Sequence, residues 1–201
     1  MDEIVCQAMA RWPNVPYCFG WLRLDARGQW RMRDERAQQL ALPGDPIRHP
    51  ALLAFIDRNY ACDDSGRWYF QNGPQRVYVD LEWVPHILRT QPGADALVPS
   101  LILHTQATVE QVDAAWMDER GRLYLRSGKI IAGVDDRDLA ILLPCLHHAG
   151  QADEEALLRW LEGAEDLTLS FTWNGRDLPL QRIASDQLEQ SFRFVCSPRP
   201  A

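Results

Sequence analysis

Residues 63–70 read Asp63-Asp64-Ser65-Gly66-Arg67-Trp68-Tyr69-Phe70, and near-copies of this phrase occur at residues 25–32 and 118–125. In each copy an Asp precedes a Gly by three positions, and apolar residues alternate with polar ones after the Gly. An Asp favours the first position of a type I turn, and a Gly accepts the positive φ angle of the bulge that follows this turn in a hairpin. The phrase therefore predicts three β-hairpins.

The three copies are unevenly spaced, because their Asp residues lie 38 and 55 positions apart. A solenoid or a propeller repeats its unit at a fixed period. The uneven spacing excludes these architectures and favours hairpins that join an ordinary sheet.

The strand that follows the second hairpin has the clearest pattern. A turn is expected at Asn72-Gly73-Pro74, and the strand is expected over residues 75–83. Apolar residues occupy every second position of this strand and polar residues the positions between them, so that one face belongs to the core and the other is polar. The polar face consists of Arg76, Tyr78, Asp80 and Glu82.

Short helices are expected between the hairpins because apolar residues recur there at helical spacing, and the charged run at residues 33–39 indicates a solvated turn of helix. These helices are predicted at residues 3–11, 33–39, 50–60, 135–143 and 153–162. A capping box over residues 108–111 indicates a further short helix or turn. Additional strands are predicted at residues 97–104, 167–173, 177–183 and 191–196.

These elements predict an α+β fold, with a mainly antiparallel sheet built from β-hairpins and a few short packing helices. Turn residues gather at 90–96, which gives the best boundary between lobes. We expect an N-terminal helix and hairpin lobe at residues 1–94 and a C-terminal α+β lobe at residues 95–201, tightly packed as one globular unit.

Composition and charge limit the classes of partner. The chain has 201 residues and a formal net charge of −7, and no dense group of Lys and Arg offsets that charge locally. Nucleic acid is therefore not an expected partner. No apolar stretch approaches the ~20 residues that span a bilayer, and the N-terminal residues lack the pattern of a signal peptide. We expect a cytoplasmic protein that does not bind membranes.

The sequence holds no familiar cofactor or metal motif. Nucleotide-binding, dinucleotide-binding, zinc-protease and EF-hand patterns are missing from it. The five cysteines form an odd number without a C-x-x-C pair, which favours reduced thiols. We expect no metal and no cofactor.

One strand pair offers a ligand-binding surface. Arg76 and Tyr78 share a face with Arg67, Tyr69 and Gln71 on the partner strand. Tyr and Arg are enriched where protein surfaces bind other molecules. The five residues predict a site for a small polar ligand or a protein partner, and solvated cross-strand ion pairing is the structural alternative.

Two other groups are candidates for catalysis. Cys145 and His147, or His148, could act as nucleophile and base, although adjacent histidines point in different directions and only one would share a site with Cys145. Asp80 and Glu82 could act as a general acid/base pair if burial separates their pKa values. A structural role explains both groups as well, with the cysteine in the core and the carboxylates in ion pairs.

A third possibility is homo-oligomerisation. Of the eight tryptophans, most fall on apolar positions of predicted strands, where core packing explains them. Trp21 lies out of phase with Leu22 and Leu24. Trp21 or an exposed sheet edge could therefore join two copies of the chain.

Several phrases carry a resemblance to a known family. They are residues 11–16, 20–22, 28–33 and 66–80, of which Trp68-Tyr69-Phe70-Gln71-Asn72-Gly73-Pro74-Gln75-Arg76-Val77-Tyr78 is the most specific. Along most of its length the chain resembles an uncharacterised proteobacterial family of cytoplasmic proteins, a domain of unknown function. The resemblance implies no activity, substrate or catalytic residue.

The function expected from the sequence is therefore binding of a ligand or a protein partner, without catalysis. A small hydrolase that uses Cys145 with His147, or Asp80 with Glu82, is the alternative.

Overall fold

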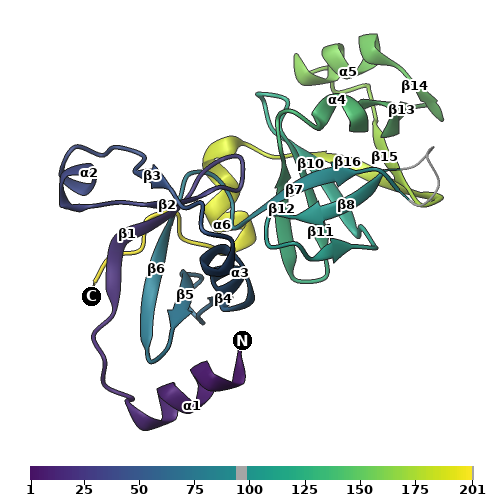
Figure 1. Cartoon of the computed structure of the whole chain (residues 1–201). Coiled ribbons are helices and arrows are strands. Elements are labelled where there is room, and N and C mark those ends of the chain that lie inside the picture. Colours follow the sequence, from purple (N-terminus) through teal and green to yellow (C-terminus); the bar gives the residue numbers. More distant parts are fainter. Residues whose placement is uncertain (94–98, 201) are drawn as a thin grey trace. The chain divides into compact units, whose positions relative to one another are not determined.

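The computed structural model describes residues 1–93 and 99–200. Within them, α-helices and strands alternate along the chain and the strands form two sheets (Figure 1). Three strand pairings are parallel, namely β1 with β6, β7 with β12 and β10 with β16, and the others are antiparallel. The predicted α+β class with mainly antiparallel sheet is confirmed.

The chain divides into two units. Unit 1 comprises Met1–Pro85, His104–Gln106 and Glu189–Ala201, and unit 2 comprises His86–Leu103 and Ala107–Leu188. The lobe boundary expected between residues 94 and 95 lies outside the described residues. The expected C-terminal lobe included residues 189–201, which group with unit 1 in the structure.

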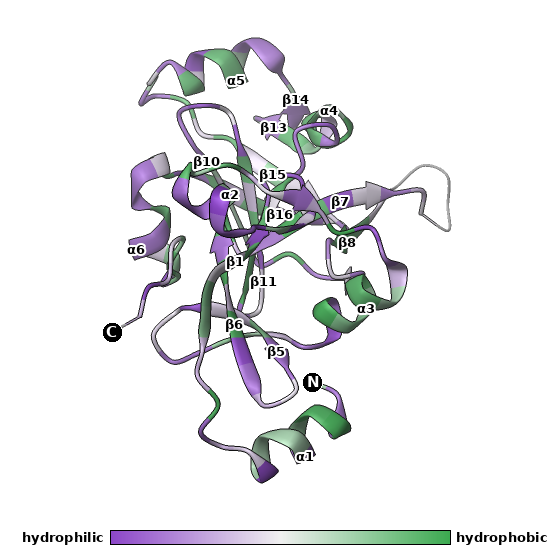
Figure 2. Cartoon of the chain, turned by 60° about the vertical axis from the view of Figure 1, so that its left-hand side comes forward, coloured by the Kyte–Doolittle hydropathy of each residue, from purple (hydrophilic) through white to green (hydrophobic). Residues whose placement is uncertain are grey.

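Unit 1 contains a six-stranded sheet in the order β3-β2-β1-β6-β5-β4. Its elements are α1 (Glu3–Arg11), β1 (Cys18–Leu24), β2 (Trp30–Met32), α2 (Glu35–Gln39), β3 (Asp45–Pro46), α3 (Pro50–Arg58), β4 (Tyr60–Cys62), β5 (Trp68–Asn72) and β6 (Gln75–Leu81). The helices expected at residues 3–11, 33–39 and 50–60 are present with small differences in length. Pro50 begins α3, whose apolar residues appear green in Figure 2.

Unit 2 contains a ten-stranded sheet in the order β14-β13-β15-β16-β10-β11-β12-β7-β8-β9. Its strands are β7 (His86–Gln91), β8 (Ser100–Leu103), β9 (Thr108–Val109), β10 (Ala114–Met117), β11 (Leu123–Ser127), β12 (Ile130–Val134), β13 (Leu146–His148), β14 (Gln151–Ala152), β15 (Ser170–Trp173) and β16 (Arg176–Arg182). Its helices are α4 (Leu139–Leu142) and α5 (Glu154–Leu161), with the 3-10 turns η1 (Leu143–Cys145) and η2 (Ser185–Gln187). The last helix, α6 (Leu188–Phe192), begins in unit 2 and continues in unit 1.

All three predicted hairpins are present. They are β1 with β2, β4 with β5, and β10 with β11. In each turn the Gly donates its N–H to the Asp carbonyl at 3.0 Å, and the three glycines Gly28, Gly66 and Gly121 have φ angles of 74°, 77° and 75°. The repeated phrase therefore encodes a turn with a glycine bulge, as its spacing indicates.

The Asp side chain completes each turn. Asp118 Oδ1 accepts the N–H groups of Arg120 and Arg122 at 3.0 and 2.9 Å, and the same two offsets recur around Asp25 and Asp63. Such bonds hold the turn closed, and they satisfy backbone N–H groups that have no partner in the hydrogen bonds between the two strands. This explains why Asp begins every copy of the phrase.

Two predicted elements differ in type from the structure. Thr108–Val109 is a strand rather than a helix start, because it pairs with β8 through Leu101 and Ile102. The strand predicted at residues 191–196 is wrong, because the chain forms α6 there and leaves it at Arg193, whose φ is 55°. The first segment is a strand because of its pairing partner, and the second depends on where α6 ends. Neither can be recognised from the local sequence pattern.

The core of unit 2 lies between its sheet and the helices α4 and α5. It contains Leu88, Leu101, Leu103, Val109, Val112, Ala115, Met117, Leu123, Leu125, Ala132, Val134, Leu142, Leu146, Ala156, Trp160, Leu169, Phe171, Trp173, Leu178 and Leu180. Asp153 caps α5 by accepting the Ala156 N–H at 2.9 Å, as the sequence predicts. No helix within the described ranges is both long and apolar enough to cross a bilayer.

Candidate functional site

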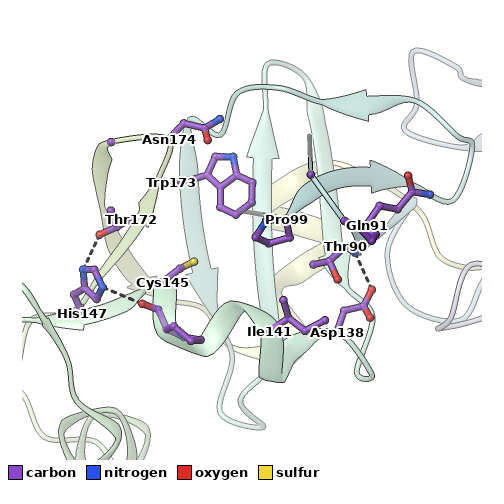
Figure 3. A pocket seen from close by; sticks show the side chains of 14 residues that line it. Thr90, Gln91, Pro99, Asp138, Ile141, Cys145, His147, Thr172, Trp173 and Asn174 are labelled. Carbon is purple, nitrogen blue, oxygen red and sulfur yellow. Dashed lines mark hydrogen bonds between the residues drawn. The ribbon is translucent and has the colours of Figure 1, made fainter. Parts of the chain in front are cut away.

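A cavity of about 790 Å³ opens in unit 2 between the ends of β7 and β15, and we call it the β7–β15 pocket (Figure 3). Its volume falls in the range of about 300–1,000 Å³ that is usual for small-molecule sites. It is lined by Thr90, Gln91, Pro92, Gly93, Pro99, Asp138, Ile141, Pro144, Cys145, His147, Thr172, Trp173, Asn174 and Gly175.

A tight turn positions one wall of this pocket. Asn174 and Gly175 connect β15 to β16, and their φ angles are 47° and 74°. Two successive positive φ angles are typical of the hairpin turn that an Asn-Gly pair favours. The Asn174 Nδ2 group also donates to the Glu110 carbonyl at 3.1 Å, which fixes the turn. The turn holds Trp173 at the last position of its strand, beside the cavity.

Trp173 leaves one polar atom without a partner. Its side chain is 5% exposed, and its Nε1 is buried without a hydrogen-bond acceptor among the described residues. Buried donors in proteins nearly always have partners, and each one left unsatisfied costs about 1–3 kcal/mol.

Asp138 forms the opposite wall. Its Oδ2 accepts the backbone N–H of Thr90 at 2.8 Å, which joins the loop before α4 to β7. No Lys, Arg or His forms a salt bridge with Asp138 within residues 1–93 and 99–200. Arg137, the preceding residue in the chain, forms its salt bridge with Asp135, so the Asp138 carboxylate lines the pocket without a salt-bridge partner among the described residues.

His147 lies in a chain of hydrogen bonds at the edge of the pocket (Figure 3). Its Nδ1 is 2.8 Å from Thr172 Oγ1, and Thr172 donates to Asp177 Oδ1 at 2.5 Å. The other ring nitrogen, Nε2, is 2.9 Å from the Pro144 carbonyl. These contacts engage both ring nitrogens of His147 within the protein.

Cys145 and His147 line the same pocket but do not form a nucleophile and base pair. Both nitrogens of His147 are engaged by Thr172 and Pro144, and Figure 3 shows the Cys145 sulfur pointing toward Trp173. Burial raises the pKa of the Cys145 thiol, which lowers the fraction of reactive thiolate at neutral pH. His148 instead contacts the Thr168 carbonyl through Nδ1 at 3.0 Å.

The predicted ligand face lies in unit 1, apart from this pocket, and its residues do come together. Tyr69 pairs with Tyr78, and Gln71 pairs with Arg76, across β5 and β6. The Arg76 guanidinium lies 4.5 Å from the centre of the Tyr69 ring, and that of Arg67 lies 4.8 Å from the Tyr78 ring. We call these five residues the Tyr78 cluster.

Most of the Tyr78 cluster is turned inward. Tyr69, Gln71 and Tyr78 are buried, although the sequence pattern predicts a solvated polar face. The Tyr78 hydroxyl donates to Asp63 at 3.0 Å, and Arg67 pairs with the same carboxylate at 2.8 Å. These bonds, with desolvation opposing them, lower the pKa of Asp63.

Two aromatic residues missed by sequence reasoning cover this face. Phe19 stacks on Tyr78 with ring centroids 4.6 Å apart, and Tyr17 lies edge-on to Tyr78 at 5.7 Å. Both belong to the segment at β1, which runs parallel to β6. Their alternation with Cys18 was visible in the sequence, but the parallel pairing was not.

Asp80 and Glu82 form ion pairs rather than an acid/base pair. Asp80 is buried and contacts Arg33 at 2.5 Å and Arg199 at 3.1 Å. Glu82 contacts Arg23 at 2.9 Å. Asp80 and Glu82 thus pair with different arginines. Ion pairing of this kind is the structural role that we gave as the alternative to catalysis for these two residues.

Trp21, the candidate interface residue, is 40% exposed on β1. Within the described part of the chain, no three His, Cys, Asp or Glu side chains are grouped closely enough to hold a metal ion. The pocket residues Thr90, Asp138, Thr172, Trp173 and Asn174 were not identified from the sequence. The Asn174-Gly175 turn was the only local signal near them.

Comparisons with known proteins agree with the predicted resemblance. A family model named DUF2944, with the description "Protein of unknown function (DUF2946)", matches residues 1–199. A search of curated proteins found no match to this sequence.

Two solved structures are similar. A DUF1285 family protein from Silicibacter pomeroyi DSS-3 shares 16% identity at a TM-score of 0.50, over 94% of this chain and 99% of that one. A DUF1285 family protein from Shewanella baltica OS155 shares 14% identity at a TM-score of 0.37, over 58% of this chain and 85% of that one. The first likeness extends to the fold alone. The match along residues 1–199 shows that the chain belongs to the DUF2944 family of proteins of unknown function.

Proposed function

We propose that this protein binds a small molecule in the β7–β15 pocket and does not transform it chemically. The observation that carries the proposal is a cavity of about 790 Å³ whose lining combines the Trp173 indole with the Asp138 carboxylate. Binding sites of this kind combine apolar walls with a few directed polar groups. Here Pro99, Ile141 and Trp173 supply apolar surface, while Thr90 and Asn174 supply polar atoms.

The hydrogen bonds around the pocket support binding without catalysis. His147 is held by Thr172 and Pro144, so it has no nitrogen free to activate the Cys145 thiol. A general base must reach the proton that it removes. A hydrolase that uses Cys145 with His147, or Asp80 with Glu82, would therefore need these groups to leave their present partners.

A cytoplasmic location and a bacterial source belong to the same proposal. The location rests on the odd number of cysteines without a C-x-x-C pair, a pattern of reduced compartments.

The test compares two variants that each add a tryptophan to an exposed helical position of unit 2. Ile141 lies on α4, lines the pocket and is 49% exposed. Leu158 lies on α5, outside the pocket, and is 61% exposed. Ile141→Trp fills the cavity, whereas Leu158→Trp makes the same kind of change elsewhere.

Binding is measured by ligand-observed NMR with a mixed-charge fragment library. We expect the wild type and Leu158→Trp to bind a common set of fragments and Ile141→Trp to lose that set. Equal binding by both variants would place the fragments elsewhere on the protein, and the proposal would then be wrong.

The Tyr78 cluster is a second candidate, as a site for an anionic group. Arg76 has no carboxylate partner within the described ranges, and its guanidinium lies over the rings of Tyr69 and Tyr17, the latter 52% exposed. Arg76→Gln removes that charge, while Arg159→Gln removes one from the exposed face of α5. Binding of phosphate or acetate that is weakened only by Arg76→Gln would support this site, and equal binding by both variants would dismiss it.

A further inference from the structure

The charged groups around the β7–β15 pocket are unbalanced. Among the described residues that line it, none is Lys or Arg, and Asp138 is the acidic one. An anionic ligand would meet this carboxylate with no lining cation beside it, which costs free energy in a partly desolvated site.

The remaining ionisable group that lines the pocket does not alter this balance. His147 shares its hydrogen bonds with Thr172 and the Pro144 carbonyl, and Asp177 accepts from Thr172 at the end of the same chain. Both nitrogens of His147 and the Asp177 carboxylate are therefore engaged within the protein. Arg137, which adjoins Asp138 in the chain, forms its salt bridge with Asp135, so the Asp138 carboxylate lines the pocket without a salt-bridge partner among the described residues.

Trp173 adds an aromatic surface to the same cavity. Phe171 packs beside it with ring centroids 6.0 Å apart and an interplanar angle of 9°, so the indole is held in place by the core. Figure 3 shows the indole ring at the wall of the pocket, with Cys145 and Pro99 on either side of it. A tryptophan face attracts organic cations through its quadrupole, and does so more strongly when water is excluded.

We infer that the ligand of the β7–β15 pocket is an organic monocation with an apolar body, such as an amine, in which the cationic group meets Asp138 and the apolar body packs against Trp173. The inference rests on the proposed function and names the chemical class of its ligand. Carboxylate and indole together are a recurrent means of recognising organic ammonium groups.

Three probes that share a phenyl body but differ in charge test this inference. They are 2-phenylethylamine, 2-phenylethanol and 3-phenylpropionate, measured by ligand-observed NMR at neutral pH against the intact chain. We expect the amine to bind more tightly than the alcohol, and the carboxylate to bind weakest.

Two charge-removing variants give the sharper comparison. Asp138→Asn removes the charge but keeps an oxygen that accepts the Thr90 N–H. Glu165→Gln removes the same charge from an exposed position of unit 2 outside the pocket. We expect Asp138→Asn to weaken amine binding at least about tenfold and alcohol binding less than about twofold, with little change in Glu165→Gln.

The outcomes separate this inference from the proposed function. If the alcohol binds as tightly as the amine, and Ile141→Trp abolishes both, then the pocket binds ligands but the inferred charge is wrong. Tighter binding of the carboxylate, or unchanged amine affinity in Asp138→Asn, would also overturn the inference. If none of the three probes binds to the wild type, both the inference and the proposed function are contradicted.

Discussion

The hydroxyl of Tyr124 donates to Asp118 Oδ2 at 2.7 Å, and both residues are almost fully buried, with Asp118 only 1% exposed. The other oxygen of Asp118 accepts two backbone N–H groups of its turn. This carboxylate thus joins the third repeated turn to the adjoining strand β11.

Removal of the Asp118 side chain should destabilise the protein strongly. Asp118→Ala leaves two backbone donors and the Tyr124 hydroxyl without their acceptor, and we expect a loss of about 3 kcal/mol in the free energy of unfolding. Asp118→Asn keeps one oxygen for the backbone donors and should lose less. Urea unfolding monitored by circular dichroism measures both losses.

The matched control is Tyr124→Phe, which removes only the hydroxyl and should cost about 1–2 kcal/mol. The double variant should lose less than the two single losses combined, because both substitutions remove the same bond. Strictly additive losses would show that the two groups do not stabilise each other.

The repeated phrase also shows what a sequence can predict. Its Asp and Gly residues specify the turns through bonds within five residues, so all three hairpins could be recognised without tertiary information. The helices at 3–11 and 153–162 were predicted for the same reason, because their apolar spacing is local and Asp153 caps the second of them.

Elements that depend on distant partners could not be predicted in the same way. Alternation in β6 correctly indicates a strand, but Tyr78 and Asp80 are buried because Phe19, Arg33 and Arg199 cover that face. The β7–β15 pocket combines segments far apart in the sequence, and its polar atoms carry no shared motif. Cys145 and His147 were singled out from the sequence, yet the bonds of His147 to Thr172 and Pro144 required the structure.

Acid should weaken unit 2 through Asp135. Burial opposes ionisation of this carboxylate, but side-chain and backbone hydrogen bonds from Arg137 outweigh it and lower its pKa from 3.8 to about 2. A carboxylate whose folded-state pKa is lowered stabilises the fold above its unfolded pKa and loses that contribution as the pH falls through the folded value. We expect a loss of about 2 kcal/mol between pH 4 and pH 2.

The variant Arg137→Gln should make stability less dependent on pH in this range, since it removes one of the two arginines that pair with Asp135, the other being Arg89. Arg120→Gln removes an exposed guanidinium near the third hairpin turn and serves as the control. Denaturant midpoints at pH 4, 3 and 2 distinguish them. The same pH dependence in both variants would rule out the Asp135 and Arg137 pair as its source.

Cys145 should react slowly with alkylating agents in the native protein. The thiol is partly buried, and its burial raises its pKa above the ordinary value of 9.0, so little thiolate is present at neutral pH. Exposed Cys6 should be modified before Cys145 at pH 7.5. Mass spectrometry after iodoacetamide treatment locates the modified residues.

A different result at Cys145 would favour the catalytic alternative. Modification of Cys145 ahead of Cys6 would indicate an activated nucleophile, in conflict with the bonds that engage His147. Denatured protein provides the control, because all five cysteines should then react.

Alkylation of Cys62 should require a higher pH than alkylation of an ordinary thiol. Its pKa is raised to about 11 by burial and by the nearby carboxylates of Asp63 and Asp64. The alkylation rate at Cys62 should therefore continue to rise between pH 9 and pH 11. Asp64→Asn removes one of these charges and should move the rise to lower pH, whereas an unchanged profile would exclude Asp64 as a cause.

Equivalent glycines of the repeated turns should differ in their tolerance of a side chain. Gly66 and Gly121 have nearly the same φ angle, 77° and 75°, so replacement by alanine imposes a similar backbone strain at both. A Cβ at Gly66 would lie 2.4 Å from the Arg193 carbonyl oxygen, whereas the nearest atom to a Cβ at Gly121 is a Leu161 methyl at 3.8 Å. Backbone must move in the first case but not in the second.

We therefore expect Gly66→Ala to cost about 3 kcal/mol and Gly121→Ala about 1 kcal/mol, measured as free energies of unfolding in urea. The difference reports the packing of residues 193–195 on the second hairpin, where the Val195 N–H donates to the Gly66 carbonyl at 3.0 Å. Removal of the Arg193 side chain should leave this difference intact, because the contact involves its backbone. Equal losses of unfolding free energy at the two glycines would mean that residues 193–195 move at little cost to admit a Cβ at Gly66. The φ angle of the turn alone would then explain why glycine is needed.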